Sequence, residues 1–213
     1  MSLPSIRAID LSCVRRDRLL FSNVNVSLSA GDLIYLSGPN GAGKTSLLRI
    51  LVGFIAPSSG TVCYDDKSTD LESVRRKLNN ELVYIGHKSA ITPHATAVEN
   101  SRFWCEQQGI QISEQHIYKV LMTLGLVGLE DVPCAQLSAG QNRRVALARL
   151  WFKAEAKFWI LDEPFTALDV KGIQLIEQSI EMFLRKGGAV LLTSHQPLQH
   201  ITEWQDLILE YQI

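Results

Sequence analysis

The chain has few cysteines and no excess of charge of either sign. Its four cysteines, at positions 13, 63, 105 and 134, are scattered along 213 residues and form no C-x-x-C pair. This spacing argues against structural zinc and a disulfide framework, and it suits a reducing cytoplasm. The formal net charge is −1, so the molecule as a whole has no electrostatic attraction to nucleic acid or to an anionic membrane. We expect no nucleic-acid partner.

Long apolar runs are also missing. No stretch approaches the ~20 consecutive apolar residues that span a bilayer, and no N-terminal run resembles a signal peptide. We therefore expect a chain that is not itself inserted in a membrane. Its length suits one large domain with a sizeable core.

The most informative segment is a glycine-rich loop between an apolar run and a helical pattern. The loop comprises Gly38, Pro39, Asn40, Gly41, Ala42, Gly43, Lys44 and Thr45, and Ser46 follows it. Residues 32–36 predict a buried strand before the loop, and residues 46–51 have helical spacing after it. Glycines let backbone N–H groups surround phosphate oxygens, and the helix N-terminus adds positive partial charge. In such a loop, Lys44 can reach the β- and γ-phosphates of a nucleoside triphosphate, and the Thr45 hydroxyl can ligate Mg²⁺.

A second site lies at the end of another apolar run. Residues 158–161 predict a strand, and Asp162 and Glu163 follow it directly. Acids at the carboxyl end of a buried strand would lie beside the phosphate loop. We expect Asp162 to bind Mg²⁺ through water, and Glu163 to act as the general base that orients the attacking water.

The order of predicted elements indicates an α/β core. Short strands are predicted over residues 5–11, 20–28, 61–64 and 82–85, with a turn at 56–60. The apolar runs at 158–161 and 189–193 are typical of parallel strands buried on both faces. An amphipathic helix is predicted over 170–185, and a helical run over 142–151. A more polar helical pattern, broken at Gly109 and Gly125, forms an insert between about 88 and 137.

Five motifs occur in an order that resembles the ATP-binding cassette family. They are the phosphate loop, Leu137-Ser138-Ala139-Gly140-Gln141, Leu161-Asp162-Glu163-Pro164, Ala167-Leu168-Asp169 and Thr193-Ser194-His195. The second resembles the L-S-G-G-Q signature, with alanine in place of its first glycine. The resemblance covers nearly the whole chain. It implies a RecA-like phosphate-loop NTPase core with an antiparallel β subdomain and a helical insert. One domain would span 1–213, with its core at about 1–87 and 138–213 and its helical subdomain at about 88–137.

The resemblance also implies a mechanism that needs two copies of the chain. ATP would lie between the phosphate loop of one copy and the signature of the other. Ser138, Ala139, Gly140 and Gln141 would form the part supplied in trans, with Ala139 tolerated only at negative φ. Asp169 would lie at the dimer seam. His195 would hold the γ-phosphate and the attacking water, and it joins Glu163 and Lys44 as a predicted catalytic residue.

Two departures from the family pattern affect the site. Most cassettes have a glutamine after the strand that ends near Ile85, whereas this chain has His87. A neutral imidazole can accept a hydrogen bond from water or ligate the metal. Most cassettes also stack an N-terminal aromatic ring on adenine, and no aromatic residue occurs around positions 14–17. Arg15 or Arg16 can stack a planar guanidinium on the base instead.

A finer resemblance is to the ATPase subunits of transporters that handle haem in c-type cytochrome maturation. It is carried by residues 85–87, 96–100, 130–133, 136–151, 159–170 and 195–198. It implies integral membrane permease subunits as partners, and a peripheral place on the cytoplasmic side of the bacterial inner membrane. The five histidines are spread out and no C-x-x-C-H occurs, so we expect no direct haem binding.

Other functions remain open at this stage. The first alternative is the ATPase subunit of a transporter for another cargo. Less expected is a regulatory ATPase of ribosomes or DNA, because such proteins usually fuse two cassettes or carry coiled-coil insertions. A nucleotide-gated binding module without hydrolysis is disfavoured by the presence of Glu163 and His195.

Overall fold

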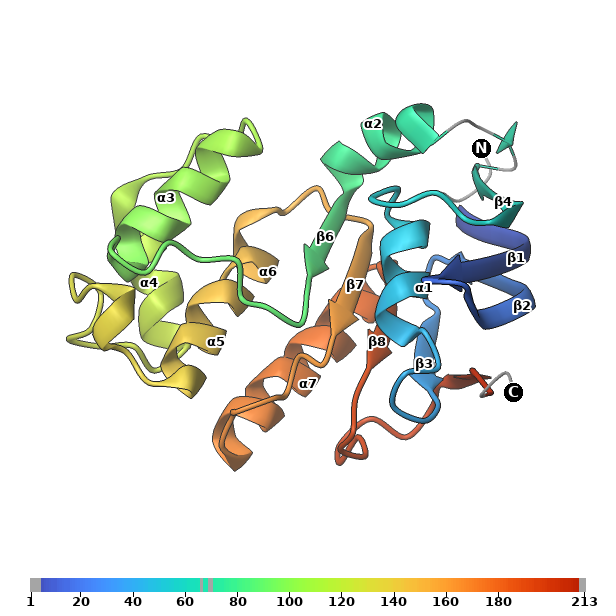
Figure 1. Cartoon of the computed structure of the whole chain (residues 1–213). Coiled ribbons are helices and arrows are strands. Elements are labelled where there is room, and N and C mark those ends of the chain that lie inside the picture. Colours follow the sequence, from blue (N-terminus) through green and yellow to red (C-terminus); the bar gives the residue numbers. More distant parts are fainter. Residues whose placement is uncertain (1–4, 66, 69–70, 211–213) are drawn as a thin grey trace.

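The computed structural model describes residues 5–65, 67–68 and 71–210, and it contains two β-sheets (Figure 1). The first sheet is antiparallel, with the order β2-β1-β4-β5. Its strands are β1 (Ser5–Arg15), β2 (Arg18–Ser29), β4 (Ser59–Tyr64) and β5 (Lys67–Ser68). The three N-terminal strands expected from the sequence are confirmed. The turn expected at 56–60 is shorter than predicted, because β4 already begins at Ser59 and pairs with β1.

The second sheet is parallel and forms the centre of the molecule. Its order is β6-β7-β8-β3-β9. Its strands are β3 (Leu33–Ser37), β6 (Leu82–Ile85), β7 (Phe158–Asp162), β8 (Ala189–Thr193) and β9 (Gln205–Ile208). The sequence pattern does not predict β9, because this edge strand is largely exposed and includes polar residues.

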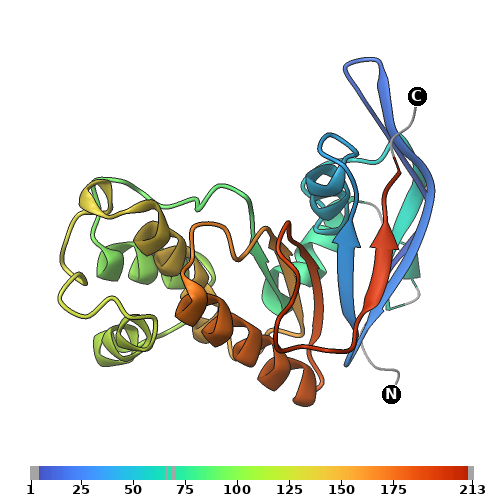
Figure 2. The ribbon, with the colours of Figure 1, turned by 90° about the horizontal axis from the view of Figure 1, so that it is seen from below.

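Helices cover both faces of the parallel sheet. The described helices are α1 (Lys44–Leu51), α2 (Leu71–Glu81), α3 (Ala97–Gln107), α4 (Glu114–Thr123), α5 (Ala139–Leu147), α6 (Arg149–Phe152) and α7 (Val170–Arg185), with a short 3₁₀ helix η1 (Cys134–Gln136), and α3 and α4 lie away from the sheet (Figure 1). In Figure 2, α7 lies along one face, and α1 lies on the other face beside the antiparallel sheet. The helical run expected over 142–151 is interrupted, because α5 ends at Leu147 and α6 begins at Arg149.

The central strands separate two hydrophobic cores. Along β7, Phe158 and Ile160 pack with α1 and the antiparallel sheet, whereas Trp159 and Leu161 pack with α7 and the other helices. Successive residues of a strand point to opposite faces. Because both faces of this sheet are covered, the side chains on both faces of β7 are buried. The ring of Trp159 stacks on Phe183 of α7 at a centroid distance of 4.0 Å.

The helical side of the molecule includes α3 and α4, and α5 and α6 contact α3. The division of the chain into a core and a helical subdomain at about 88 and 137 stays a prediction. Within the described ranges, no helix is both long enough and apolar enough to cross a bilayer.

Candidate nucleotide-binding site

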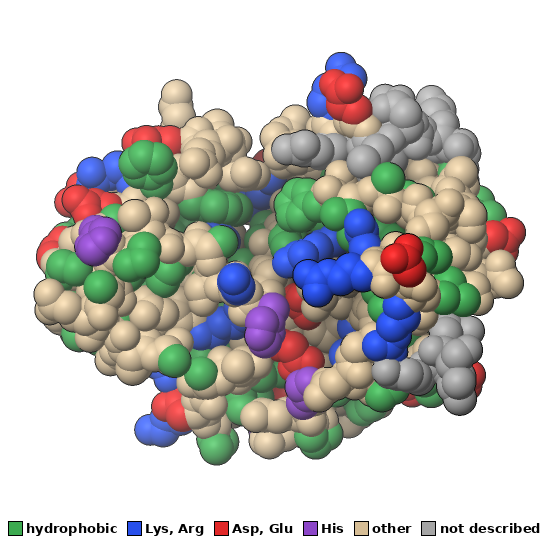
Figure 3. Space-filling model, in the orientation of Figure 1, with side chains coloured by type: hydrophobic (Ala, Val, Ile, Leu, Met, Phe, Trp, Pro, Cys, Tyr) green, Lys and Arg blue, Asp and Glu red, His purple; other side chains and the backbone are tan. Residues whose placement is uncertain are grey.

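Four loops that follow parallel strands meet at one edge of the central sheet. The phosphate loop follows β3, residues 86–88 follow β6, Glu163 follows β7 and Ser194 follows β8. They open on a cleft of about 590 Å³, a volume in the range of small-ligand sites. The cleft is lined by Arg15, Arg16, Arg18, Leu20, Asn40, Gly41, Gly43, Lys44, Thr45, Ser46, His87, Asp162, Glu163 and His195. Basic, acidic and histidine side chains meet in the hollowed middle of the face in Figure 3.

The phosphate loop leaves the N-terminus of α1 open toward this cleft. Gly43, the N-cap residue, has a φ of 100°, and a Cβ there would lie 2.9 Å from the ring of Phe21. Unlike α3, α4, α5 and α7, α1 has no side chain bonded to its first N–H groups. Such N–H groups bind anions. The Lys44 ammonium donates to the carbonyls of Gly38 and Pro39, at 2.6 and 3.2 Å, and Ala42 is buried in the core.

Asp162 and Thr45 lie together, although 117 positions separate them. The Thr45 hydroxyl donates to Asp162 Oδ2 at 2.8 Å, and the Thr193 hydroxyl donates to Asp162 Oδ1 at 3.1 Å. A hydroxyl and a carboxylate at the border of a cleft are hard oxygen ligands of the kind that Mg²⁺ prefers, with water completing its shell. This pair therefore fits Mg²⁺. His87 is exposed on the same cleft, and no described hydrogen bond joins it to either residue.

Glu163 has a left-handed backbone, with a φ of 54°. Its N–H donates to the carbonyl and the hydroxyl of Thr193, at 3.2 and 2.9 Å. Its carboxylate is almost buried: Oε2 accepts the His195 N–H at 3.1 Å, and Oε1 lies 3.5 Å from His195 Nε2. Oε1 has no hydrogen bond within the described part of the chain. Two of the three predicted catalytic residues, Glu163 and His195, therefore lie next to each other at the border of the cleft.

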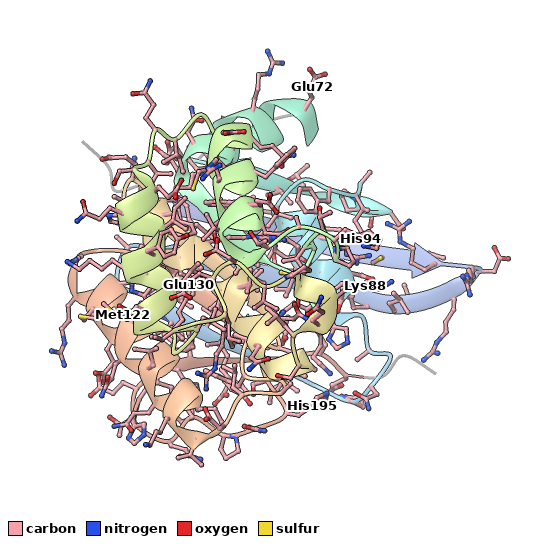
Figure 4. All side chains as sticks on the ribbon, turned by 90° about the vertical axis from the view of Figure 1, so that its left-hand side faces the viewer. Glu72, Lys88, His94, Met122, Glu130 and His195 are labelled. Carbon is pink, nitrogen blue, oxygen red and sulfur yellow. The ribbon has the colours of Figure 1, made fainter. Side chains whose placement is uncertain are left out.

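Tyr35 holds the loop that carries His195. From β3, its hydroxyl lies 2.8 Å from the carbonyl of Ser194 and 3.1 Å from that of Gln196, the two neighbours of His195. Burial raises the pKa of Tyr35 above its ordinary value, so the hydroxyl remains a donor. His195 itself is exposed, and it lies at the opposite end of the molecule from Glu72 of α2 (Figure 4).

The signature lies at the start of α5 and outside the cleft lining. Ser138 is the N-cap: its hydroxyl accepts the Gln141 N–H at 3.2 Å, and the Gln141 side chain accepts the Ser138 N–H at 2.8 Å. Ala139 begins the helix and is not among the residues with positive φ, so the condition placed on this alanine is met. A Cβ at Gly140 would lie 2.4 Å from the carbonyl oxygen of Ala167, so glycine is required at this second position.

Asp169 links the loop after β7 to the signature helix. It is the N-cap of α7 and accepts the Gly172 N–H at 2.8 Å, and its Oδ1 also pairs with Arg144 of α5 at 2.6 Å. The Gly172 amide and the Arg144 guanidinium lower the pKa of Asp169 below 3.8. The loop that was expected at a dimer seam is therefore fixed to the helix that carries the signature.

The arginines considered for base stacking lie at the tip of the β1–β2 hairpin. Arg15 pairs with Arg18 across the turn, and Arg16 and Asp17 have positive φ, at 50° and 60°. All three arginines line the cleft. The described lining contains no Phe, Tyr or Trp.

Sequence reasoning assigns no role to three residues that the site uses: Tyr35, Thr193 and Arg143. Tyr35 and Thr193 belong to apolar runs that look like ordinary strands. Arg143 belongs to a helical pattern and gives no sign in the sequence that it is buried. For Thr193, the only feature of the sequence that could indicate a role is its position directly before Ser194 and His195.

The fold and this cleft define a nucleoside triphosphatase of the phosphate-loop class, with the motif order of an ATP-binding cassette. A family model described as "ABC transporter" matches residues 21–166. The chain therefore belongs to the ATP-binding cassette transporter family, in which it groups with the cytochrome c biogenesis ATP-binding export proteins CcmA. It is an ATPase.

Curated relatives are similar to the chain over most of their length. The CcmA protein of Pasteurella multocida is 44% identical over 189 residues, which cover 89% of this chain and 87% of that protein. The CcmA protein of Idiomarina loihiensis is 48% identical over 195 residues, covering 92% and 87%.

Solved structures are similar in fold. A putative ATP-binding protein of an ABC transporter from Pyrococcus furiosus has a TM-score of 0.79 at 22% identity, covering 96% of this chain and 97% of that chain. A dimeric ATP-binding cassette bound to ADP and phosphate also has a TM-score of 0.79 at 22% identity, covering 90% and 88%. These likenesses show the fold.

Proposed function

We propose that the chain is the ATP-hydrolysing subunit of a membrane transporter complex for cytochrome c maturation, in which hydrolysis drives haem export or release of a haem-loaded chaperone. One observation carries this proposal: the chain is 44% and 48% identical to two proteins named as cytochrome c biogenesis export proteins, over 87% of the length of each. Its place is the cytoplasmic side of the bacterial inner membrane, and its partners are integral membrane permease subunits.

ATP binds with its phosphates on the loop at 38–45. Backbone N–H groups and the uncapped N-terminus of α1 receive phosphate oxygens. The Lys44 ammonium exchanges the carbonyls of Gly38 and Pro39 for the β- and γ-phosphates. Asn40 and Ser46 line the same cleft.

Glu163 and His195 act on the attacking water. Glu163 Oε1 is buried and accepts no hydrogen bond within the described structure, although His195 Nε2 lies 3.5 Å away, so this oxygen can accept a hydrogen bond from a water molecule. His195 lies beside it, where its imidazole can hold the γ-phosphate. Thr45 and Asp162 hold Mg²⁺. An ion held there would neutralise charge on the phosphates.

The working unit contains two copies of the chain. None of Ser138, Ala139, Gly140 or Gln141 lines the cleft of its own chain. In the capping box, the Ser138 hydroxyl oxygen accepts the Gln141 N–H, so the hydroxyl hydrogen can still be donated to an anion. The N–H groups of Ala139 and Gly140 lie at the helix N-terminus, where anions bind. A second copy completes each site by placing its signature on the γ-phosphate.

A second cleft supports a membrane partner. It has a volume of about 670 Å³ and lies between α1 and β6 on one side and α3 and α6 on the other. Its lining includes Phe54, Tyr84, Trp104 and His87, and Phe54 is 52% exposed. His87 lines both clefts. A permease segment seated here would therefore contact a residue of the ATP site.

Complementation in the organism that carries the gene tests this function. Deletion of the gene is expected to abolish covalent haem on c-type cytochromes, measured by haem staining of separated proteins. The wild-type gene restores the stain. Glu163→Gln binds ATP without hydrolysing it and leaves the stain absent, whereas Glu155→Gln, an exposed acid away from the cleft, serves as the matched control and restores it.

Normal haem staining in the deletion strain would point to another cargo. Haem binding gives a second check: because the chain itself is not expected to bind haem, titration of the purified protein should give no stoichiometric Soret shift. A shift that is lost on histidine or cysteine substitution would contradict that expectation.

A further inference from the structure

Arg143 is a buried arginine whose described hydrogen bonds all go to backbone carbonyls. It lies in α5, two residues after the signature, and is 3% exposed. Its Nη1 donates to the carbonyl of Gly86 at 2.8 Å, and its Nη2 donates to those of Asp162 and Glu163, both at 2.8 Å. Its Nε lies 3.4 Å from the carbonyl of Pro164. One side chain thus joins the loops after β6 and β7.

We propose that Arg143 is a positioning residue for hydrolysis: it fixes the left-handed Glu163 peptide and ties it to the His87 loop and to the signature helix. The proposal rests on the proposed role of Glu163 in orienting water.

The backbone of Glu163 is held in an unfavourable conformation. A non-glycine residue at a φ of 54° persists only where its surroundings hold it. Both backbone polar groups of Glu163 are bonded: its N–H donates to the Thr193 hydroxyl, and its C=O accepts a hydrogen bond from Arg143. These two anchors set the direction of the Glu163 side chain, which then meets the backbone N–H of His195 at 3.1 Å.

Arg143 also sets the spacing between the loop after β6 and the loop after β7. The carbonyl of Gly86 immediately precedes His87. It accepts a hydrogen bond from the same planar Arg143 guanidinium that donates to the Glu163 carbonyl. A guanidinium is a rigid fork, so it fixes the relative positions of the groups it bonds. A movement of the His87 loop or of the signature helix would therefore pull on the peptide of the water-orienting acid.

Charge supports the same placement. Burial lowers the pKa of Arg143 below its ordinary value, and the nearby carboxylates of Asp162 and Glu163 oppose that shift. The two acids of the site thus favour the charged form of the residue that holds their backbone.

Lys153 provides a matched control. It is also a buried cation, 6% exposed, that donates to backbone carbonyls. Its Nζ bonds the carbonyl of Leu82 at 3.1 Å, the Gln108 side chain at 2.6 Å and the carbonyl of Asn79. It does not line the ATP cleft. Loss of Lys153 should disturb packing as loss of Arg143 does, without touching Glu163.

The test uses the purified full chain with the variants Arg143→Gln, Arg143→Lys and Lys153→Gln. Steady-state ATPase assays give kcat and KM, a fluorescent ATP analogue gives Kd, and thermal melting gives Tm. Arg143→Gln should lower kcat by about 10-fold to 100-fold while Kd changes by less than about 3-fold, because the groups that hold the nucleotide are intact. Arg143→Lys keeps a cation and a long stem, and should keep part of the rate.

Lys153→Gln should lower Tm while kcat stays within about 3-fold of the wild type. The proposal is overturned if the kcat of Arg143→Gln stays within about 3-fold of the wild type. It is also overturned if kcat falls and Kd rises in parallel with a loss of folded protein. If Arg143→Gln does not fold, the split between kcat and Kd in Arg143→Lys decides. Glu163→Gln is measured in parallel: an unchanged rate there would instead refute the role of Glu163.

Discussion

Glu163 and Ala167, at the residue scale, show how the loop after β7 is built around strained positions. Their φ values are 54° and 63°, and such positions cost about 1–3 kcal/mol each. Glu163 is held by Thr193 and Arg143, and the carbonyl of Ala167 abuts Gly140 of the signature. The strain lies in the loop that carries Glu163, the acid proposed to orient water, where an accurate side-chain direction matters most.

The arginines of the β1–β2 hairpin define a prediction about the nucleobase. If a guanidinium stacks on adenine, Arg16→Ala should raise the KM for ATP by about 3-fold to 10-fold. The preference for ATP over GTP should change little, because a guanidinium face does not read the edge of a base. Kinetics with both nucleotides measure this, and Arg76→Ala, an exposed arginine on α2, is the control. Unchanged KM values in both Arg16→Ala and Arg15→Ala would discard stacking.

At the scale of elements, the helix termini divide into capped and uncapped ones. Thr96, Ser113, Ser138 and Asp169 each accept a backbone N–H at the start of their helices, whereas α1 has no side-chain cap. A side-chain cap of this kind stabilises a helix by about 1 kcal/mol. The start of the signature helix is thus capped within its own chain, while the first N–H groups of α1 have no side-chain partner and would be available to phosphate in the proposed binding mode.

The two small residues at the start of α5 lead to opposite predictions. Gly140→Ala places a methyl group 2.4 Å from the Ala167 carbonyl oxygen, so the loop after β7 must shift, and we expect ATPase activity to fall by about 10-fold or more. Ala139→Gly restores the family's usual residue in an unstrained helical position. It should cost about 0.5–1 kcal/mol of stability and leave activity within about 3-fold. ATPase assays and thermal melts measure both variants. Equal activities of Gly140→Ala and Ala139→Gly would contradict the close contact between Gly140 and the Ala167 carbonyl.

The strands and helices around the phosphate loop could be predicted because local patterns specify them. β3 and α1 flank the glycines, β7 is a dense apolar run, and α7 begins and ends where its amphipathic pattern does. The meeting of Thr45 with Asp162 follows from the rule that parallel strands end at one edge. The burial of Arg143 could not be predicted, because it depends on where α5 packs against loops far away in sequence.

At the scale of the whole molecule, the proposed dimer would divide each ATP site between two chains. The cleft carries the phosphate loop and the acids, and the signature is not part of its lining. Because a two-fold interface presents the same surfaces from both copies, one surface would complete both sites. The ion pair between Asp169 and Arg144 connects the two halves within each chain.

A size measurement tests this pairing. Glu163→Gln with ATP and Mg²⁺ should elute as a dimer in gel filtration, because bound ATP is not hydrolysed and holds the two copies together. Adding Ser138→Arg should return the protein to a monomer that still binds nucleotide, since an arginine fills the place of the γ-phosphate contact. Gln115→Arg, on the exposed face of α4, is the control and should leave the dimer intact. A dimer that survives Ser138→Arg would exclude the signature from the interface.

The uncapped N-terminus of α1 has a consequence for the abundance of the protein. In the proposed binding mode, phosphate would cap the N–H groups of α1 that have no side-chain cap, so nucleotide binding would also complete a helix of the core. A ligand present at 100 times its Kd stabilises a fold by about 2.7 kcal/mol. When cellular ATP falls, the chain loses this contribution, and the fraction open to proteases rises with it. The energy state of the cell would then set how many copies survive as well as how fast each one turns over.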